Sequence, residues 1–196
     1  PEDLNKIKAQ YPFFFKAGNP DSIWINKLKT PLLKELYKEV QLKYPTLGPV
    51  EADMEKMFAY VQYYFPKYKT PRVITLISEV DTEAKAFYVD TLALVSLDCY
   101  LGKDHRFYVD FPEYKKAELE ENQILPNLVS TFCYGKIAPP MDRTLLSAMI
   151  YYGKELYVKD KLIPFYSDAV KIGYTETQLQ FCQANEYYMW SNLVEN

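Results

Sequence analysis

The sequence predicts an α+β fold that is predominantly helical, in which helices pack around a small sheet of two or three strands. Apolar residues recur at helical spacing before residue 66 and again after residue 112. Between residues 72 and 97 the pattern changes to apolar, β-branched runs that are too short for helices. A chain of 196 residues is long enough for one hydrophobic core, so we expect a single globular domain over residues 1–196.

Four helices are expected before the strands. Pro31 suits a first helical position, because the N–H that proline lacks would have no partner there. The residues after it form an apolar stripe with charged residues on the far side. The expected helices are Leu4–Tyr11, one capped by Asp21 or Ser22, one from Pro31 through Val40, and Val50–Phe65, which Pro66 ends.

The strands are expected at residues 72–80, 86–89 and 92–97, with a turn at residues 81–83. Later helices are expected near Pro112–Glu120, near Pro126–Lys136, from Asp142 to about Lys159, and from Thr175 to the end. The last of these begins with a capping box formed by Thr175 and Gln178. A small sheet followed by helices is loosely zincin-like, which is an analogy of fold alone.

The charge pattern argues against nucleic-acid binding. The chain has 23 basic and 26 acidic side chains, well interspersed, and a net charge of −3. It contains no basic stripe that could release phosphate counterions. No apolar run approaches the roughly 18–20 residues of a membrane span. The chain starts at Pro1 without the features of a signal peptide, so we expect that any export signal has been removed or left out.

Few residue types that support catalysis are present, and we expect neither an enzyme nor a cofactor or metal site. His105 is the only histidine, so the zinc-binding His-Glu-x-x-His motif cannot be formed. The sequence also lacks a Gly-x-Ser-x-Gly elbow and a glycine-rich phosphate loop. Three widely spaced cysteines lie among apolar residues, which predicts a structural role for Cys99, Cys133 and Cys182.

Aromatic residues are abundant, with 19 tyrosines and 11 phenylalanines. Tyrosine combines a large apolar body with a hydroxyl that can remain in water, so it suits both a core and a partner surface. We expect most of these side chains in the core and a minority in an exposed patch.

The loop after the last expected strand contains several polar residues. Asp104 and His105 could contact a divalent cation or a partner, with Asp98 nearby. The simpler interpretation is a turn, in which Gly102 adopts a conformation that other residues avoid and Asp104 caps the following segment. We favour the turn, because polar residues in loops usually have no special role.

Glu186 is a second candidate, because apolar residues surround it at helical spacing. If it is buried, its carboxylate needs a partner such as Arg143 or Lys154, or its pKa must rise. A structural ion pair is the favoured interpretation. Glu155, in contrast, is expected to be solvated.

Four runs of sequence resemble a known family: Leu97–Tyr108, Leu146–Tyr157, Lys171–Thr175 and Gln183–Glu186. Together they are similar to the gliding motility lipoproteins, the GldB-type proteins of the Bacteroidota cell envelope. The pattern Leu-Asp-x-Tyr-Leu-Gly-x-Asp-His is a hallmark of that family. In this chain it comprises Asp98, Tyr100, Gly102, Asp104 and His105.

The resemblance implies a lipoprotein of the cell envelope, facing the periplasm or located at the outer membrane. Its anchor would be a lipidated cysteine that lies outside this chain. The implied partners are protein components of the gliding apparatus or of the linked secretion machinery. Similar proteins continue past the last expected helix, so a further C-terminal segment is expected to be missing from this chain.

The leading hypothesis is a non-catalytic envelope component that acts through protein–protein contacts, using exposed Tyr and Phe. Two alternatives remain open. One is a degenerate zincin-like hydrolase rebuilt around carboxylates such as Glu186. The other is a general envelope binding protein, because relatives also occur in bacteria that do not glide.

Overall fold

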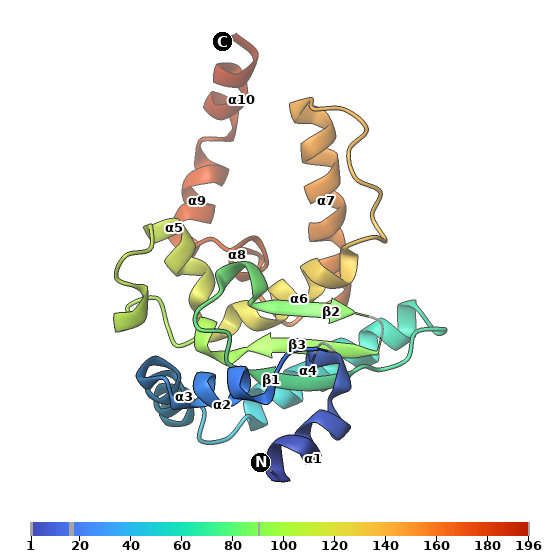
Figure 1. Ribbon diagram of the computed structural model, residues 1–196. Helices are drawn as coiled ribbons and strands as arrows, with labels where there is room; N and C mark the ends of the chain where they lie inside the picture. The colour runs from blue at the N-terminus through green and yellow to red at the C-terminus, as the bar shows by residue number, and fades with distance from the viewer. Residues whose placement is uncertain (1, 16–17, 90, 196) are drawn as a thin grey trace.

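The computed structural model describes residues 2–15, 18–89 and 91–195. Within these residues ten α-helices surround one small mixed sheet of three strands, which confirms the expected α+β class (Figure 1). The helices are α1 (Glu2–Gln10), α2 (Asp21–Lys29), α3 (Pro31–Lys43), α4 (Gly48–Tyr64), α5 (Glu113–Lys116), α6 (Ile124–Cys133), α7 (Leu145–Leu162), α8 (Asp168–Ile172), α9 (Glu176–Ala184) and α10 (Glu186–Glu195).

The sheet contains β1 (Arg72–Leu76), β2 (Ala86–Val89) and β3 (Leu92–Ser96) in the order β1-β3-β2. β2 and β3 form an antiparallel hairpin, whereas β1 runs parallel to β3. The central strand is therefore the last of the three in sequence. The connection from β1 to β2 must pass across one end of β3.

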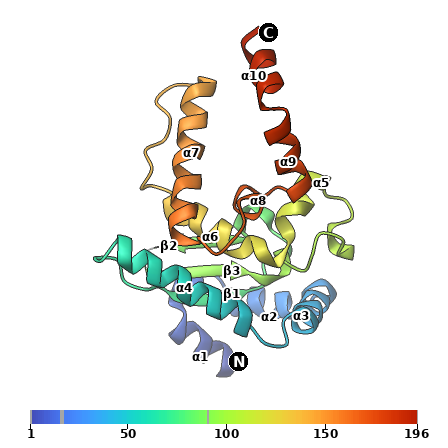
Figure 2. The same cartoon turned by 180° about the vertical axis from the view of Figure 1, so that it is seen from behind.

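One face of the sheet carries most of the core. The register places Ala93 and Val95 of β3 beside Ala86 and Tyr88 of β2, and all four side chains are buried. α4 and α6 cover this face, and α1 lies on the other side of the sheet (Figures 1 and 2). A cluster of rings from Phe65, Tyr68, Tyr88 and Phe132 packs edge to face between α4, β2 and α6.

Several boundaries differ from those that the sequence predicts. β1 ends at Leu76 and not near residue 80, because Glu79 and Val80 have φ values of 64° and 61° that no strand can contain. Pro20 occupies the cap position of α2, so the prediction that Asp21 or Ser22 is the cap was wrong. The expected helix over 112–120 is a short α5 followed by a 3₁₀ turn at Ala117–Leu119.

The C-terminal region also differs in part. The capping box of Thr175 and Gln178 is present as predicted. The expected single helix is broken at Asn185, where φ is −114° and ψ is 13°, into α9 and α10. The sequence analysis did not predict α8, which Ser167 caps and Gly173 ends.

Two helical arms project from the same side of the body. One is the N-terminal half of α7, whose C-terminal end packs near α4 and α6, and the other is the pair α9 and α10 (Figures 1 and 2). The chain ends at the far tip of the second arm, opposite the side where α1 lies. Among the described helices, none is long and apolar enough to cross a membrane.

Two glycines provide a matched test of this description. Gly173 ends α8 with φ of 82°, so Gly173→Ala should lower the free energy of unfolding by about 1 kcal/mol through backbone strain. Gly153 lies inside α7, where an added Cβ meets no atom within 4 Å. Gly153→Ala should therefore raise the free energy of unfolding by up to about 1 kcal/mol. Urea denaturation measures the free energy of unfolding of both variants. Changes of the same sign and size would contradict the assignment of Gly173 as the end of α8.

Candidate functional site

Asp98 is fully buried in a 3₁₀ turn, Leu97–Cys99, directly after β3. Its carboxylate accepts hydrogen bonds from the backbone N–H of Ser78, at 3.0 Å, and of Val80, at 2.7 Å. These are the residues that cross the end of β3, where Glu79 and Val80 adopt left-handed conformations. Such conformations cost about 1–3 kcal/mol each for residues other than glycine. Asp98 therefore stabilises a strained crossing between β1 and β2.

Three buried tyrosine hydroxyls hold the residues that follow Asp98. Tyr108 donates to the carbonyl of Asp98 at 2.6 Å and accepts from the N–H of Leu101 at 3.0 Å. Tyr44, at the end of α3, donates to the carbonyl of Tyr100 at 2.5 Å. Tyr100 accepts from the side-chain amide of Asn127 on α6 at 3.1 Å. Burial raises the pKa of Tyr44, Tyr100 and Tyr108 above the usual value, so all three phenols stay protonated at neutral pH.

Gly102 forms the turn that the sequence predicts, with φ of 110°. Its N–H donates to the carbonyl of Leu119, and the next N–H, of Lys103, donates to Glu120 Oε1 at 3.0 Å. Asp104 is exposed and does not cap the following turn, so that part of the prediction was wrong. His105 is the cap instead, because its Nδ1 accepts from the N–H of Phe107.

The only histidine attaches this loop to α3. His105 Nε2 lies 3.5 Å from Glu39 Oε2, and the guanidinium of Arg106 lies 3.1 Å from Glu39 and 3.3 Å from Glu35. Hydrogen bonds from Arg106 and then His105 lower the pKa of Glu39. Asp98 faces residues 78–80, whereas His105 faces α3, and no group of three metal-ligating side chains forms within the described part of the chain.

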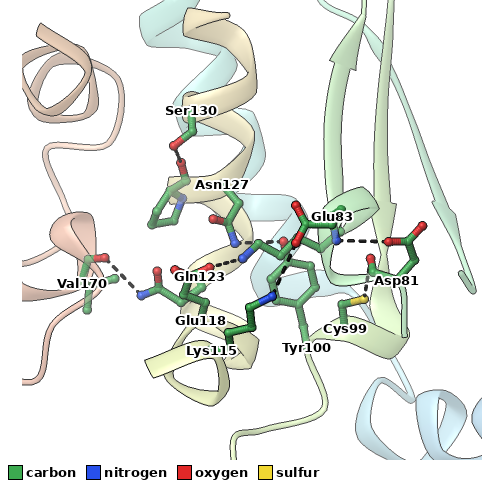
Figure 3. A network of polar contacts seen from close by, with 12 residues as sticks. Asp81, Glu83, Cys99, Tyr100, Lys115, Glu118, Gln123, Asn127, Ser130 and Val170 are labelled. Carbon is green, nitrogen blue, oxygen red and sulfur yellow. Dashed lines mark hydrogen bonds and ion pairs between the residues drawn. The ribbon is translucent and has the colours of Figure 1, made fainter. Parts of the chain in front are cut away.

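A polar groove that the sequence analysis missed lies beside the start of β2 (Figure 3). Asn127, Ser130 and Thr131 of α6 line one side. Charged residues from α5, from the 3₁₀ turn after it and from the segment before β2 line the other. The charges pair with one another: Lys85 with Glu118, and Lys115 with Glu83 at 3.6 Å. The signal in the sequence is the spacing of three polar residues on an otherwise apolar helix. Asn127 bonds Tyr100, so the hallmark residues lie directly behind this groove.

Glu155 lies in a half-buried polar cluster and not in solvent, which corrects the sequence expectation. Its carboxylate accepts from the hydroxyl of Ser130 at 2.6 Å and pairs with Lys159 at 3.1 Å. Lys159 also donates to the carbonyl of Lys171 at 3.2 Å. Burial alone would lower the pKa of Lys171, but its bonds to Asp160 and Asp168 raise it. The cluster fixes the base of α7 against α6 and α8.

Glu186 is exposed at the start of α10, so the favoured interpretation of a structural ion pair was wrong. It pairs with neither Arg143 nor Lys154 in the structure. It lies at the rim of an apolar groove of about 340 Å³ between α7 and the second arm. The other residues of this groove are Met149, Cys182, Gln183, Met189, Trp190 and Leu193.

Exposed apolar side chains gather on the two arms. We define the arm surface as the following exposed residues of the N-terminal half of α7, of α9 and of α10: Leu145, Leu146, Met149, Ile150, Tyr152, Phe181, Tyr187, Tyr188, Met189, Trp190, Leu193 and Val194. Most large apolar patches on soluble proteins are sites of interaction. The arm surface contains tyrosine, methionine and tryptophan, which are residue types enriched in protein–protein interfaces.

Replacing Asp98 should destabilise the whole fold. In Asp98→Asn one backbone N–H of the crossing faces an amide N–H₂ in place of a carboxylate oxygen, so we expect a loss of about 2–4 kcal/mol in the free energy of unfolding. Asp104→Asn is the matched control, because Asp104 is exposed in the same loop, and should change it by less than about 0.5 kcal/mol. Urea denaturation compares them, and a small effect at Asp98 would refute its proposed role.

The cysteines should differ in reactivity. Burial raises the pKa of Cys99 and Cys133 to about 12, so both remain protonated thiols at pH 8. Cys182 is partly exposed on α9. We expect iodoacetamide at pH 8 to modify Cys182 alone in the folded protein and all three thiols in denaturant, as mass spectrometry of the peptides would show. Rapid labelling of Cys99 in the folded state would contradict its burial.

Comparison with known proteins gives one line of evidence on identity. The family model described as the gliding motility protein GldB, a lipoprotein family, matches residues 1–196, the whole chain. No curated protein and no solved structure matches the chain. The match is in agreement with the resemblance of the hallmark run around Asp98 and with the helical structure. The chain belongs to the GldB family of gliding motility lipoproteins.

Proposed function

We propose that this protein is a non-catalytic component of the gliding machinery, anchored in the cell envelope, and that it binds other protein components through the arm surface. The family ties the chain to gliding motility and to the envelope lipoproteins. The observation that carries the finer proposal is the arm surface itself, because its large apolar side chains are exposed on helices that project from the body.

The energetics favour a protein partner for this surface. Full burial of one large apolar side chain contributes about 1.5–3 kcal/mol, so a few such contacts are enough for a specific complex. Tyr187, Tyr188 and Trp190 are of the residue types that most often dominate binding energy. The second arm carries acids at Glu176, Glu186 and Glu195 and no basic residue, which favours a partner with basic side chains around its apolar contact.

Two groups of charged side chains are paired within the protein, which supports a role without catalysis at those two places. His105 is held by Glu39, and the polar groove beside β2 has its lysines and glutamates paired with one another. A hydrolase of the carboxylate type needs two acids facing one substrate. Glu186 is the only acid among the described residues that line its groove, whose other members are mainly apolar. A hydrolase built around Glu186 therefore has less support than the binding role.

The position of α1 relative to the arm tips suits a protein that is anchored through a segment preceding α1. α1 lies on the opposite side of the body from the arm tips (Figure 1). An anchor attached on that side would direct both arms away from the membrane and towards partners in the adjoining compartment. The periplasmic face and the outer membrane both permit this orientation. A general envelope binding role in bacteria that do not glide would use the same surface.

A pair of matched tyrosine variants tests the arm surface. Tyr187 and Tyr188 form an edge-to-face pair on α10, and Tyr63 and Tyr64 form a similar pair on α4. Tyr187 and Tyr63 are both 76% exposed. In a gene-deletion strain complemented with full-length protein, Tyr187→Ser with Tyr188→Ser should abolish surface gliding and reduce crosslinked recovery of machinery proteins at least tenfold, because the contact loses its central aromatic rings.

The control variant, Tyr63→Ser with Tyr64→Ser, should glide normally at the same protein level. Both variants should retain the melting temperature of the parent within a few degrees, because the residues are exposed. Normal gliding of the arm variant would refute the assignment of this surface. Normal gliding, secretion and envelope integrity in the deletion strain itself would refute the wider proposal.

A further inference from the structure

β1 is an edge strand with an open side. Among the described residues it pairs only with β3. The N–H of Arg72 donates to the carbonyl of Thr91, which shows which residues of β1 face β3. Alternate residues of a strand bond to the same neighbour, so Arg72, Ile74 and Leu76 bond to β3. The backbone groups of Val73 and Thr75 therefore point away from the sheet. Both residues are exposed, and no described residue forms a hydrogen bond with their outward groups.

An apolar groove of about 470 Å³ runs beside this open edge. The side chains of Val73 and Thr75 form one wall, and α4 forms the other. Met54, Phe58 and Val95 are among the buried side chains that line it. This volume lies within the range of ligand-binding pockets, about 300–1,000 Å³. The groove thus lies where alternate side chains of an added strand would point.

Two acids on α4 give the groove a charge preference. Glu51 and Glu55 both line the groove, are one helical turn apart and are exposed. Like charges at this spacing destabilise a helix by about 0.2–0.5 kcal/mol. No described cation pairs with either acid, although Lys56 on the same helix pairs with Asp53. A basic side chain from a bound segment would relieve this repulsion.

The geometry points to a peptide-binding site at this edge: an extended segment of a partner protein adds to β1 as a further strand, places alternate apolar side chains in the groove, and directs a lysine or arginine to Glu51 and Glu55. Main-chain hydrogen bonds to Val73 and Thr75 supply affinity, and the groove and the acids supply specificity. The site uses no residue of the arm surface. Pairing of two copies through β1 is disfavoured, because it would bring the acids of both copies together.

An array of acetylated heptapeptides tests the site. The peptides alternate Val, Leu, Phe or Tyr with Lys or with Glu, and binding is measured by fluorescence polarisation. We expect the Lys series to bind at least tenfold more tightly than the Glu series. Titration of the best Lys peptide should shift the amide resonances of Val73 and Thr75 in ¹⁵N-edited NMR spectra, and shifts confined to the arm residues would overturn the assignment to β1.

Methylation of peptide amides tests the added strand without altering the protein. Two versions of the best peptide carry N-methyl groups on alternate residues, one on the odd and one on the even positions. Only alternate amides of an added strand face β1, so one version should lose binding and the other should retain most of it. Equal binding of both versions would overturn the strand pairing.

Protein variants test the contributing residues. Glu51→Gln with Glu55→Gln should weaken binding of the Lys peptide roughly fivefold, as expected for two partly exposed ion pairs. Asp110→Asn is the matched control, an exposed acid that lines neither the groove nor the arm surface, and should not change the affinity. Val73→Pro removes an outward N–H and should weaken binding at least tenfold while the β1–β3 bonds remain. Absence of binding across the whole array, or a β1-linked dimer in sedimentation, would overturn the proposal.

Discussion

The buried carboxylate of Asp98 and the crossing that it holds constrain the rest of this structure. β3 is the last strand in sequence and the middle one in space, so the chain must pass from β1 to β2 across its end. That passage uses left-handed conformations at Glu79 and Val80, which are unfavourable by themselves. Asp98 ends β3 at the same place and accepts from both Ser78 and Val80. Because a buried charge is costly without such donors, the carboxylate and the crossing require each other.

The run Leu97–Tyr108, which contains the hallmark pattern, also connects distant parts of the fold. Tyr108 fixes the backbone of Asp98, Tyr100 reaches Asn127 on α6, and Arg106 attaches the loop to α3. These contacts join the helices before the sheet to the helices after it. The run that marks the family is therefore mainly a framework. We infer that recognition takes place on surfaces which the framework supports, and not within the run itself.

Two such surfaces differ in chemistry. The arm surface is made of exposed side chains on projecting helices, and it suits an apolar helical or aromatic partner with basic residues at its edge. The edge of β1 offers backbone hydrogen bonds, a narrow apolar groove and the carboxylates of Glu51 and Glu55. A component with both could hold a folded partner at one site and an extended segment at another. The polar groove beside β2 has its charges already paired, so we assign it a structural role.

The sequence by itself determined the features that depend on near neighbours. Pro31 starts α3 as predicted, Thr175 and Gln178 form their capping box, and Gly102 turns the chain, because each acts on backbone groups within a few residues. The three short strands follow in the same way from their β-branched runs. The resemblance in the hallmark run also correctly indicated the family over the whole chain.

Only the tertiary structure decided what the polar residues do. Asp98 binds residues 18 and 20 positions away, and Glu155 meets Ser130 from 25 positions away, so no local pattern could assign either partner. Glu186 has apolar neighbours at helical spacing, and a structural ion pair was the favoured interpretation for that reason. Glu186 is exposed because the helix is interrupted at Asn185 and the second arm projects from the body. Periodicity identifies which face of a helix is apolar, whereas the packing of distant elements determines whether that face is covered.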